Sequence, residues 1–245
     1  LNSMIFSFKP EEKLILALDQ MSEVEMFCLL DRLPDLVWVK VGLELFTLLG
    51  PEVIYKLRDL DKKVFLDLKF HDIPMTMAKA CYRAAQTGAE LITVHASAGI
   101  KGLRESNQSA IKGAHDAGLP PPTVLAVTVL TSWDQEGFAQ ELAINQTLSE
   151  RVSFFAQLAF DAGIGGCVCS PMEVNQLRNS FPEPFQLITP GIRSLGVNLD
   201  DQVRVMTPHK ALNAGSSKLV IGREITRASE PDKVFKRICS EMLAN

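Results

Sequence analysis

The sequence predicts a single (β/α)8 barrel, and three observations carry this prediction. Eight short apolar runs recur along the 245 residues, and longer stretches with helical spacing separate them. Strands that alternate with helices form a parallel sheet, and eight such units in a chain of roughly 250 residues fit a closed barrel. No tract rich in Pro, Ser and Gly divides the chain, so we expect one domain over residues 1–245.

Each expected element follows from its local pattern. The eight expected strands are the apolar runs at residues 14–19, 36–42, 63–70, 91–96, 123–130, 166–170, 185–192 and 218–225. Helices are expected between them, as at residues 23–33, 76–88 and 148–163. In the last of these, apolar residues recur three and four apart and the pattern stops at a glycine. An open, doubly wound sheet is the alternative, but the GxGxxG signature typical of that fold follows no early strand here.

Composition narrows the possible partners. The net charge of −4 argues against nucleic acid or an anionic membrane surface as a partner. The longest apolar run, at residues 124–130, is far shorter than the ~18 residues of a membrane helix. Five cysteines do not make a disulfide framework, and the pair at Cys167 and Cys169 lacks a second pair for zinc. Free thiols and a cytoplasmic location are therefore expected.

The first residues are expected to lie outside the barrel. Residues 1–8 are too short and lack the basic start of a signal peptide. We expect them to form an N-terminal extension, of which the three residues before Met4 are a remnant of cloning.

The hexad Asp67-Leu68-Lys69-Phe70-His71-Asp72, at the end of the third expected strand, is the most informative segment. Residues two apart on a strand face the same side, so Asp67 and Lys69 should lie together, about 6–7 Å apart along the backbone. Asp72 follows the strand, where a loop could return it to the pair. Two carboxylates around an ammonium keep a lysine charged, which suits a proton donor or a cation facing a carbanion. A structural ion pair at the strand end is the alternative.

Polar residues also mark the other expected strand ends, where this barrel class carries its chemistry. In chain order they are Asp19, Lys40, Asp67 with Lys69, His95, Thr131 with Ser132, Ser170, Arg193 and Arg223. The strand starts are apolar or merely solvated. This one-sided placement favours a functional site over a structural ion pair.

The last two loops resemble a phosphate site, which this architecture often places after strands seven and eight. Arg223 follows Gly222, a combination that offers backbone amides and a bidentate guanidinium, and Arg193 lies in a second glycine-containing turn. Residues 194–201 are polar and could form a mobile lid. Gln202 at its end could reach the ligand when that lid closes.

Several segments together resemble the orotidine 5′-phosphate decarboxylase family over essentially the whole chain. They are, in the order of the chain, ALD, KVG, DLKFHDIPMT, VTVLTS, PGIR and IGREIT. The DxKxxD hexad alone is shared with a wider suprafamily, whereas FHDIPxT, PGIR and GR are more specific. Met75 stands where many relatives have asparagine. The resemblance implies conversion of orotidine 5′-monophosphate to UMP and CO2, the last step of de novo pyrimidine synthesis, without a metal or an organic cofactor.

The resemblance also implies roles by position, in a homodimer with shared active sites. Lys69 is the proton donor to C6 of the pyrimidine. Asp67, Lys40 and Asp72 complete an alternating charge network, with Asp72 contributed by the neighbouring subunit. The implied substrate contacts are Asp19 and Lys40 on the ribose, with Thr76 from across the interface, Thr131 and Ser132 on the pyrimidine edge, and Arg193, Gln202, Gly222 and Arg223 on the phosphate.

Two rival functions remain at this point. The metal-dependent branch of the same suprafamily acts on sugar phosphates through an enediolate, and Glu44 is the one extra carboxylate that could join Asp67 or Asp72 around a divalent ion. A barrel that only binds a phosphate ligand is the other rival. Buried charges argue against it, because burying them is costly unless they serve a function.

Overall fold

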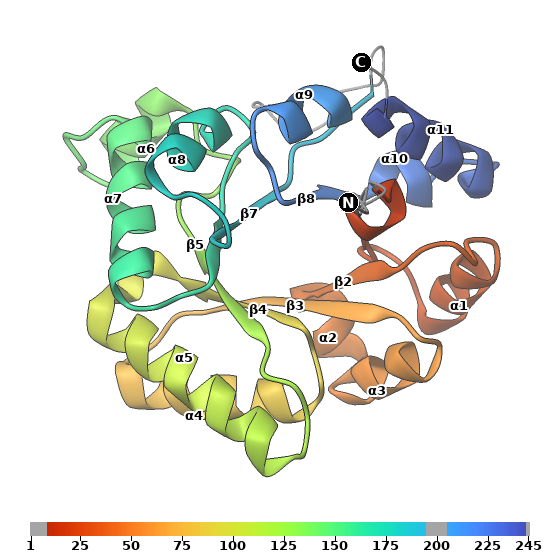
Figure 1. Ribbon diagram of the computed structural model, residues 1–245, viewed down its shortest axis with the longest axis horizontal. Helices are drawn as coiled ribbons and strands as arrows, with labels where there is room; N and C mark the ends of the chain where they lie inside the picture. Colours follow the sequence, from red (N-terminus) through yellow and green to blue (C-terminus); the bar gives the residue numbers. More distant parts are fainter. Residues whose placement is uncertain (1–8, 195–204, 244–245) are drawn as a thin grey trace, which may run out of the picture.

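The computed structural model describes residues 9–194 and 205–243, which form a closed barrel of eight parallel strands with helices around it (Figure 1). Each strand pairs with its neighbour in sequence, and β8 pairs with β1 to close the barrel. The strands are β1 Leu14–Ala17, β2 Trp38–Gly42, β3 Lys63–Phe70, β4 Leu91–His95, β5 Thr123–Val127, β6 Gly166–Val168, β7 Gln186–Thr189 and β8 Lys218–Ile221. The predicted (β/α)8 barrel is confirmed, and the open doubly wound sheet is excluded.

The helices cover the outside of the barrel (Figure 1). They are α1 Glu23–Asp31, α2 Leu43–Leu49, α3 Glu52–Asp59, α4 Pro74–Gln86, α5 Gly99–Asp116, α6 Gln135–Glu141, α7 Leu148–Asp161, α8 Val174–Ser180, α9 Pro208–Asn213, α10 Arg223–Thr226 and α11 Pro231–Leu243, with short 3-10 turns η1 Pro10–Glu12 and η2 Ala96–Ala98. Helix α4 begins at Pro74, two residues before the expected start, because proline is well tolerated in a first helical turn. None of the helices in the described residues is long and apolar enough to span a membrane.

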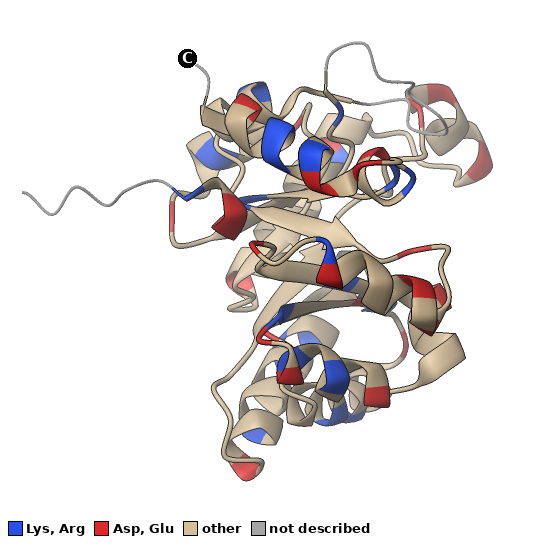
Figure 2. Ribbon diagram, turned by 90° about the vertical axis from the view of Figure 1, so that its right-hand side faces the viewer, with Lys and Arg blue, Asp and Glu red and all other residues tan. Residues whose placement is uncertain are grey.

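Apolar side chains pack on both sides of the strands, inside the barrel and between the barrel and the helices. Alternate strand residues such as Ile15, Phe65 and Leu125 fill the inside of the barrel, and their neighbours pack under the helices. Because both faces of a parallel sheet are covered, its strands are apolar almost throughout. Figure 2 shows Lys and Arg interspersed with Asp and Glu on the outer helices of the face that it presents.

Six of the eight strands end earlier than their apolar runs predicted, whereas β2 and β3 end as predicted, at Gly42 and Phe70. β1 stops at Ala17 instead of residue 19, β5 at Val127 instead of 130, and β7 at Thr189 instead of 192. In those six the last residues of the run leave the sheet and enter the loop or helical turn that follows. Several of them, such as Asp19, Leu130 and Pro190, line a cleft at the carboxyl ends of the strands.

Candidate active site

The cleft lies at the carboxyl ends of the strands and consists of two adjoining cavities, of about 150 and 260 Å³. The two share Lys40, Pro190 and Val220 in their walls, so they form one continuous depression. The smaller cavity holds the charged residues of β2 and β3. The larger one extends to the loops that follow β7 and β8.

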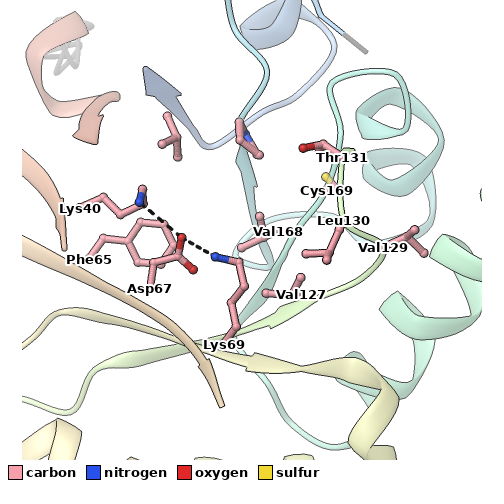
Figure 3. A pocket seen from close by; sticks show the side chains of 12 residues that line it. Lys40, Phe65, Asp67, Lys69, Val127, Val129, Leu130, Thr131, Val168 and Cys169 are labelled. Atoms are coloured by element: carbon pink, nitrogen blue, oxygen red, sulfur yellow. Dashed lines mark ion pairs between the residues drawn. The ribbon is translucent and has the colours of Figure 1, made fainter. Parts of the chain in front are cut away.

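A buried carboxylate lies between two ammonium groups in the smaller cavity (Figure 3). The Nζ of Lys69 is 2.9 Å from Oδ2 of Asp67, and the Nζ of Lys40 is 3.7 Å from the same oxygen. The Asp67 side chain is only 11% exposed. A third contact is the hydroxyl of Thr93, which donates a hydrogen bond to Oδ1 of Asp67 at 3.0 Å. Asp67 is thus bound on both oxygens.

Lys40 also binds a second carboxylate, which extends the charge network toward the larger cavity. Its Nζ donates to both carboxylate oxygens of Asp19, at 3.0 and 3.1 Å. Gly42 makes this contact possible, since a Cβ at that position would lie 2.8 Å from Oδ1 of Asp19 and 3.0 Å from the Lys40 Nζ. A larger residue at this position of the KVG segment would therefore displace the Asp19 carboxylate or the Lys40 ammonium.

The backbone at Lys69 departs from a regular strand. The register between β3 and β4 shifts between Leu66 and Phe70, and Lys69 has a φ of 51°. For a residue other than glycine, this left-handed backbone conformation costs of order 1–3 kcal/mol. Bulge-like irregularities of this kind change the direction of side chains, often near active sites. The Lys69 N–H donates to Oγ1 of Thr93 at 2.9 Å, which anchors the irregular segment. The regular alternation expected through residue 69 is wrong, although Asp67 and Lys69 do meet.

Opposing effects act on the pKa of Asp67. Burial alone would raise it, but the charges of Lys40 and Lys69 and the hydrogen bonds from Lys69 and Thr93 outweigh burial and hold the pKa below its ordinary value of 3.8. Asp67 therefore carries a negative charge at neutral pH. It holds the Lys69 ammonium at the edge of the cavity.

Asp72 does not return to this pair within its own chain. It is exposed, and its Oδ1 accepts a hydrogen bond from the N–H of Ile73 at 2.6 Å. Among the ion pairs of the described residues, none joins Asp72 to Lys69. One chain thus places one carboxylate between two lysines, whereas the sequence suggested two carboxylates around one lysine. Thr76, in the first turn of α4, is exposed as well.

The larger cavity gathers the residues expected to bind a phosphate. Arg193, Gly222 and Arg223 all line it, together with Asp19. Arg193 is buried, and its Nη1 donates to the carbonyl of Ile192 at 2.8 Å. Gln202 and residues 195–201 of the expected lid lie outside the described residues.

The expected pyrimidine contacts divide between the cavity and the surface. Thr131 lines the smaller cavity, whereas Ser132 is exposed and is absent from the described lining of both cavities. Sequence reasoning missed the apolar wall of this cavity, formed by Phe65, Val127, Val129, Leu130, Val168, Cys169, Pro190 and Val220. It also missed Thr93, whose only signal was a hydroxyl in the otherwise apolar run LITV.

Glu44, the extra carboxylate considered for a divalent ion, has another partner. One of its oxygens accepts a hydrogen bond from the Gln20 N–H at 2.9 Å. Within residues 9–194 and 205–243, no three His, Cys, Asp or Glu side chains form a group suited to a metal.

Fold and cleft together define a (β/α)8-barrel protein with a buried Asp–Lys network beside a cavity lined by two arginines. A profile of the orotidine 5′-phosphate decarboxylase / HUMPS family matches residues 12–238. The chain belongs to this family, which confirms the resemblance seen in its motifs.

Individual relatives agree with this assignment. An orotidine 5′-phosphate decarboxylase of Prochlorococcus marinus is 67% identical over 98% of this chain and 100% of its own. That of Parasynechococcus marenigrum (strain WH8102) is 55% identical over 96% of each chain. The crystal structure of orotidine 5′-phosphate decarboxylase from Lactobacillus acidophilus has a TM-score of 0.82 and 36% identity, covering 95% of this chain and 100% of that one.

The lowered pKa of Asp67 predicts how stability depends on pH. A carboxyl with a depressed folded pKa stabilises the fold above its unfolded value of 3.8, and this contribution is lost as pH falls through the folded value. Below about pH 4, the unfolding free energy of Asp67→Asn should therefore vary less with pH than that of the parent, by up to about 1.4 kcal/mol per pH unit. Urea unfolding between pH 3 and 7 measures both slopes. Equal slopes would contradict the assigned environment.

Proposed function

We propose that the protein is a carboxy-lyase that converts orotidine 5′-monophosphate to UMP and CO2, the last step of de novo pyrimidine synthesis. The observation that carries this proposal is the buried Lys40–Asp67–Lys69 network, in a cleft that continues to Arg193 and Arg223. Membership of the family, with curated decarboxylases up to 67% identical over nearly the whole chain, supports it.

The reaction explains why such a charge network is useful. Loss of the carboxylate leaves an electron pair on C6, a vinylic carbon with no conjugated group to accept it. The barrier is therefore very high, and the enzyme must lower it by an amount toward the upper part of the ~8–23 kcal/mol typical of enzymes. A preplaced cation beside the developing carbanion and the exclusion of water can provide this without a cofactor.

We assign the cation and the proton to Lys69. The bond from C6 to the carboxylate breaks, CO2 leaves, and the electron pair that stays on C6 takes a proton from the Lys69 ammonium. The resulting amine regains a proton from water. Asp67 orients Lys69 through their 2.9 Å contact, and Lys40 keeps Asp67 ionised. Asp67 also repels the substrate carboxylate, and this repulsion disappears as neutral CO2 forms.

The remaining contacts of the substrate follow the length of the cleft. Thr131 and Ser132 are assigned to the pyrimidine edge, and Asp19 and Lys40 to the ribose hydroxyls. Arg193, Gln202, Gly222 and Arg223 are assigned to the phosphate. Binding energy from the phosphate, far from the reacting carbon, can then hold the base in its reactive position.

The working site also needs a second chain in this proposal. Asp72 and Thr76 are exposed, as expected of groups that act in a neighbouring subunit. Ile73 and Met75 beside them are 66% and 61% exposed, and such neighbouring apolar side chains are typical of an interface. We therefore propose a homodimer in which Asp72 of each chain completes the charge network of the other. The five free cysteines support a reducing compartment, and we propose the cytoplasm.

The parent enzyme provides the first test. Orotidine 5′-monophosphate should be consumed with loss of its ultraviolet absorbance, and the rate should survive exhaustive EDTA treatment because a lysine replaces the metal as the cation. Loss of activity on chelation with recovery in Mg²⁺ would favour the sugar-phosphate branch of the family. Tight binding without turnover would favour a barrel that only binds its ligand.

Lys69→Ala should reduce decarboxylation to a trace while UMP still binds, because the lysine acts in the transition state. Single-turnover assays and UMP titration measure the two effects separately. The matched control is Lys210→Ala, an exposed lysine on α9, which should keep the parent rate. A Lys69→Ala enzyme with substantial activity would show that another group donates the proton.

The shared site predicts complementation between two inactive variants. Lys69→Ala and Asp72→Ala homodimers should each be nearly inactive, since every site lacks one group. After subunit exchange, a hybrid dimer collects both defects in one site and leaves the other intact. Random exchange makes about half of the dimers hybrids, so roughly a quarter of all sites should recover. If tagged subunits exchange and activity does not rise, then Asp72 serves the site of its own chain.

A further inference from the structure

A hydrogen-bonded ring of four residues joins the two turns that carry Arg193 and Arg223, and none of the four is among the described lining residues of the cleft. Ser194 directly follows Arg193, and Glu224 directly follows Arg223. The other two members, Arg237 and Glu241, lie one helical turn apart on α11, outside the barrel. Figure 1 shows α11 next to α10, the short helix that begins at Arg223.

The ring is closed by four hydrogen bonds. The Ser194 N–H donates to Oε2 of Glu224 at 3.1 Å, and the Ser194 hydroxyl donates to Oε2 of Glu241 at 2.7 Å. The Arg237 guanidinium completes it, with Nη2 2.9 Å from Oε1 of Glu224 and Nη1 3.2 Å from Oε1 of Glu241. Each carboxylate thus binds Arg237 with one oxygen and Ser194 with the other.

The ring is buried on its inner side, at Glu224 and Ser194, whereas the Arg237 and Glu241 side chains are 45% and 33% exposed. The Glu224 side chain is only 3% exposed, and Ser194 is 4% exposed. A buried carboxylate without its cation is unfavourable, so the Glu224 carboxylate needs the Arg237 guanidinium beside it. Arg237 can bind two carboxylates at once because its planar guanidinium offers several donors in a fixed geometry.

The ring constrains the arginines through the backbone. Consecutive Cα atoms are about 3.8 Å apart, so the bond between Ser194 and Glu224 limits how far the preceding residues can separate. Those residues are Arg193, in the segment after β7, and Arg223, the first residue of α10, and both line the same cavity. Two cations bind one phosphate well only when their spacing fits it, and a misplacement of about 1 Å can cost up to about a hundredfold.

We propose that Ser194, Glu224, Arg237 and Glu241 are positioning residues that set the spacing of Arg193 and Arg223 for a phosphate monoester. The proposal rests on the function proposed above, in which both arginines bind the substrate phosphate. Helix α11 then determines affinity for the phosphate end of the nucleotide without touching it. The pyrimidine end of the cleft, which the ring does not contact, is independent of it.

The test compares a ligand with phosphate, UMP, with one that lacks it, uridine, as inhibitors of the full-length enzyme. Arg237→Ala should raise the inhibition constant of UMP and the KM for orotidine 5′-monophosphate about tenfold and leave that of uridine within twofold. Arg237→Lys should fall between the parent and Arg237→Ala, because one ammonium cannot reproduce the two-pronged contact. Lys233→Ala is the matched control, since Lys233 lies on the same helix as Arg237 and its ion pair with Glu230, just before that helix, is outside the ring. This variant should leave the inhibition constants of both UMP and uridine unchanged.

Each outcome decides the proposal. Unchanged UMP inhibition in Arg237→Ala, or equal weakening of UMP and uridine, would overturn it, the second result indicating general damage to the fold. If Arg237→Ala does not fold, Ser194→Ala removes only the hydroxyl contact to Glu241 and should show the same selective loss of UMP, at about threefold or more. A parent that binds UMP no better than uridine would reject the phosphate site itself, and the positioning role with it. A parent that binds UMP selectively but does not turn over substrate would reject only the proposed reaction.

Discussion

The charge of Asp67, enclosed by the barrel and bound by two lysines, is the constraint on which the site depends. A carboxylate at this depth is costly unless cations and hydrogen bonds surround it, and Lys40, Lys69 and Thr93 provide both. Removing one partner of such a buried pair typically costs about 3–5 kcal/mol. Stability and reactivity therefore share one arrangement, because the contact that neutralises Asp67 also holds the Lys69 ammonium at the cavity wall.

Local backbone features follow from this constraint. The positive φ of Lys69 brings its ammonium next to Asp67, and Thr93 binds both the Lys69 backbone and the Asp67 side chain. Gly42 leaves room for Asp19 beside Lys40. Farther along the cleft, we propose that the ring of Ser194, Glu224, Arg237 and Glu241 sets the spacing of the two arginines. Backbone and neighbouring side chains thus position each charged group, and apolar side chains wall the smaller cavity beside the Lys69 ammonium.

The sequence predicted the barrel and the location of the cleft because both depend on local patterns. Apolar runs identified the strands, and the polar residues after them marked the carboxyl ends. Periodicity assumes regular geometry, so it could not predict the shifted register at Lys69 or the outward position of Asp72. Nor could it predict Thr93 or the ring that joins Ser194 to Glu241, 47 residues away, because those contacts arise only when distant segments pack together.

A crystal structure of the enzyme with UMP tests this account most directly. The account predicts that C6 of the base faces the Lys69 Nζ within about 3–3.5 Å, the separation of reacting atoms poised for reaction. It also predicts that the phosphate lies between Arg193 and Arg223, in the cavity that both line. A base bound away from Lys69, or a phosphate bound outside that cavity, would contradict it.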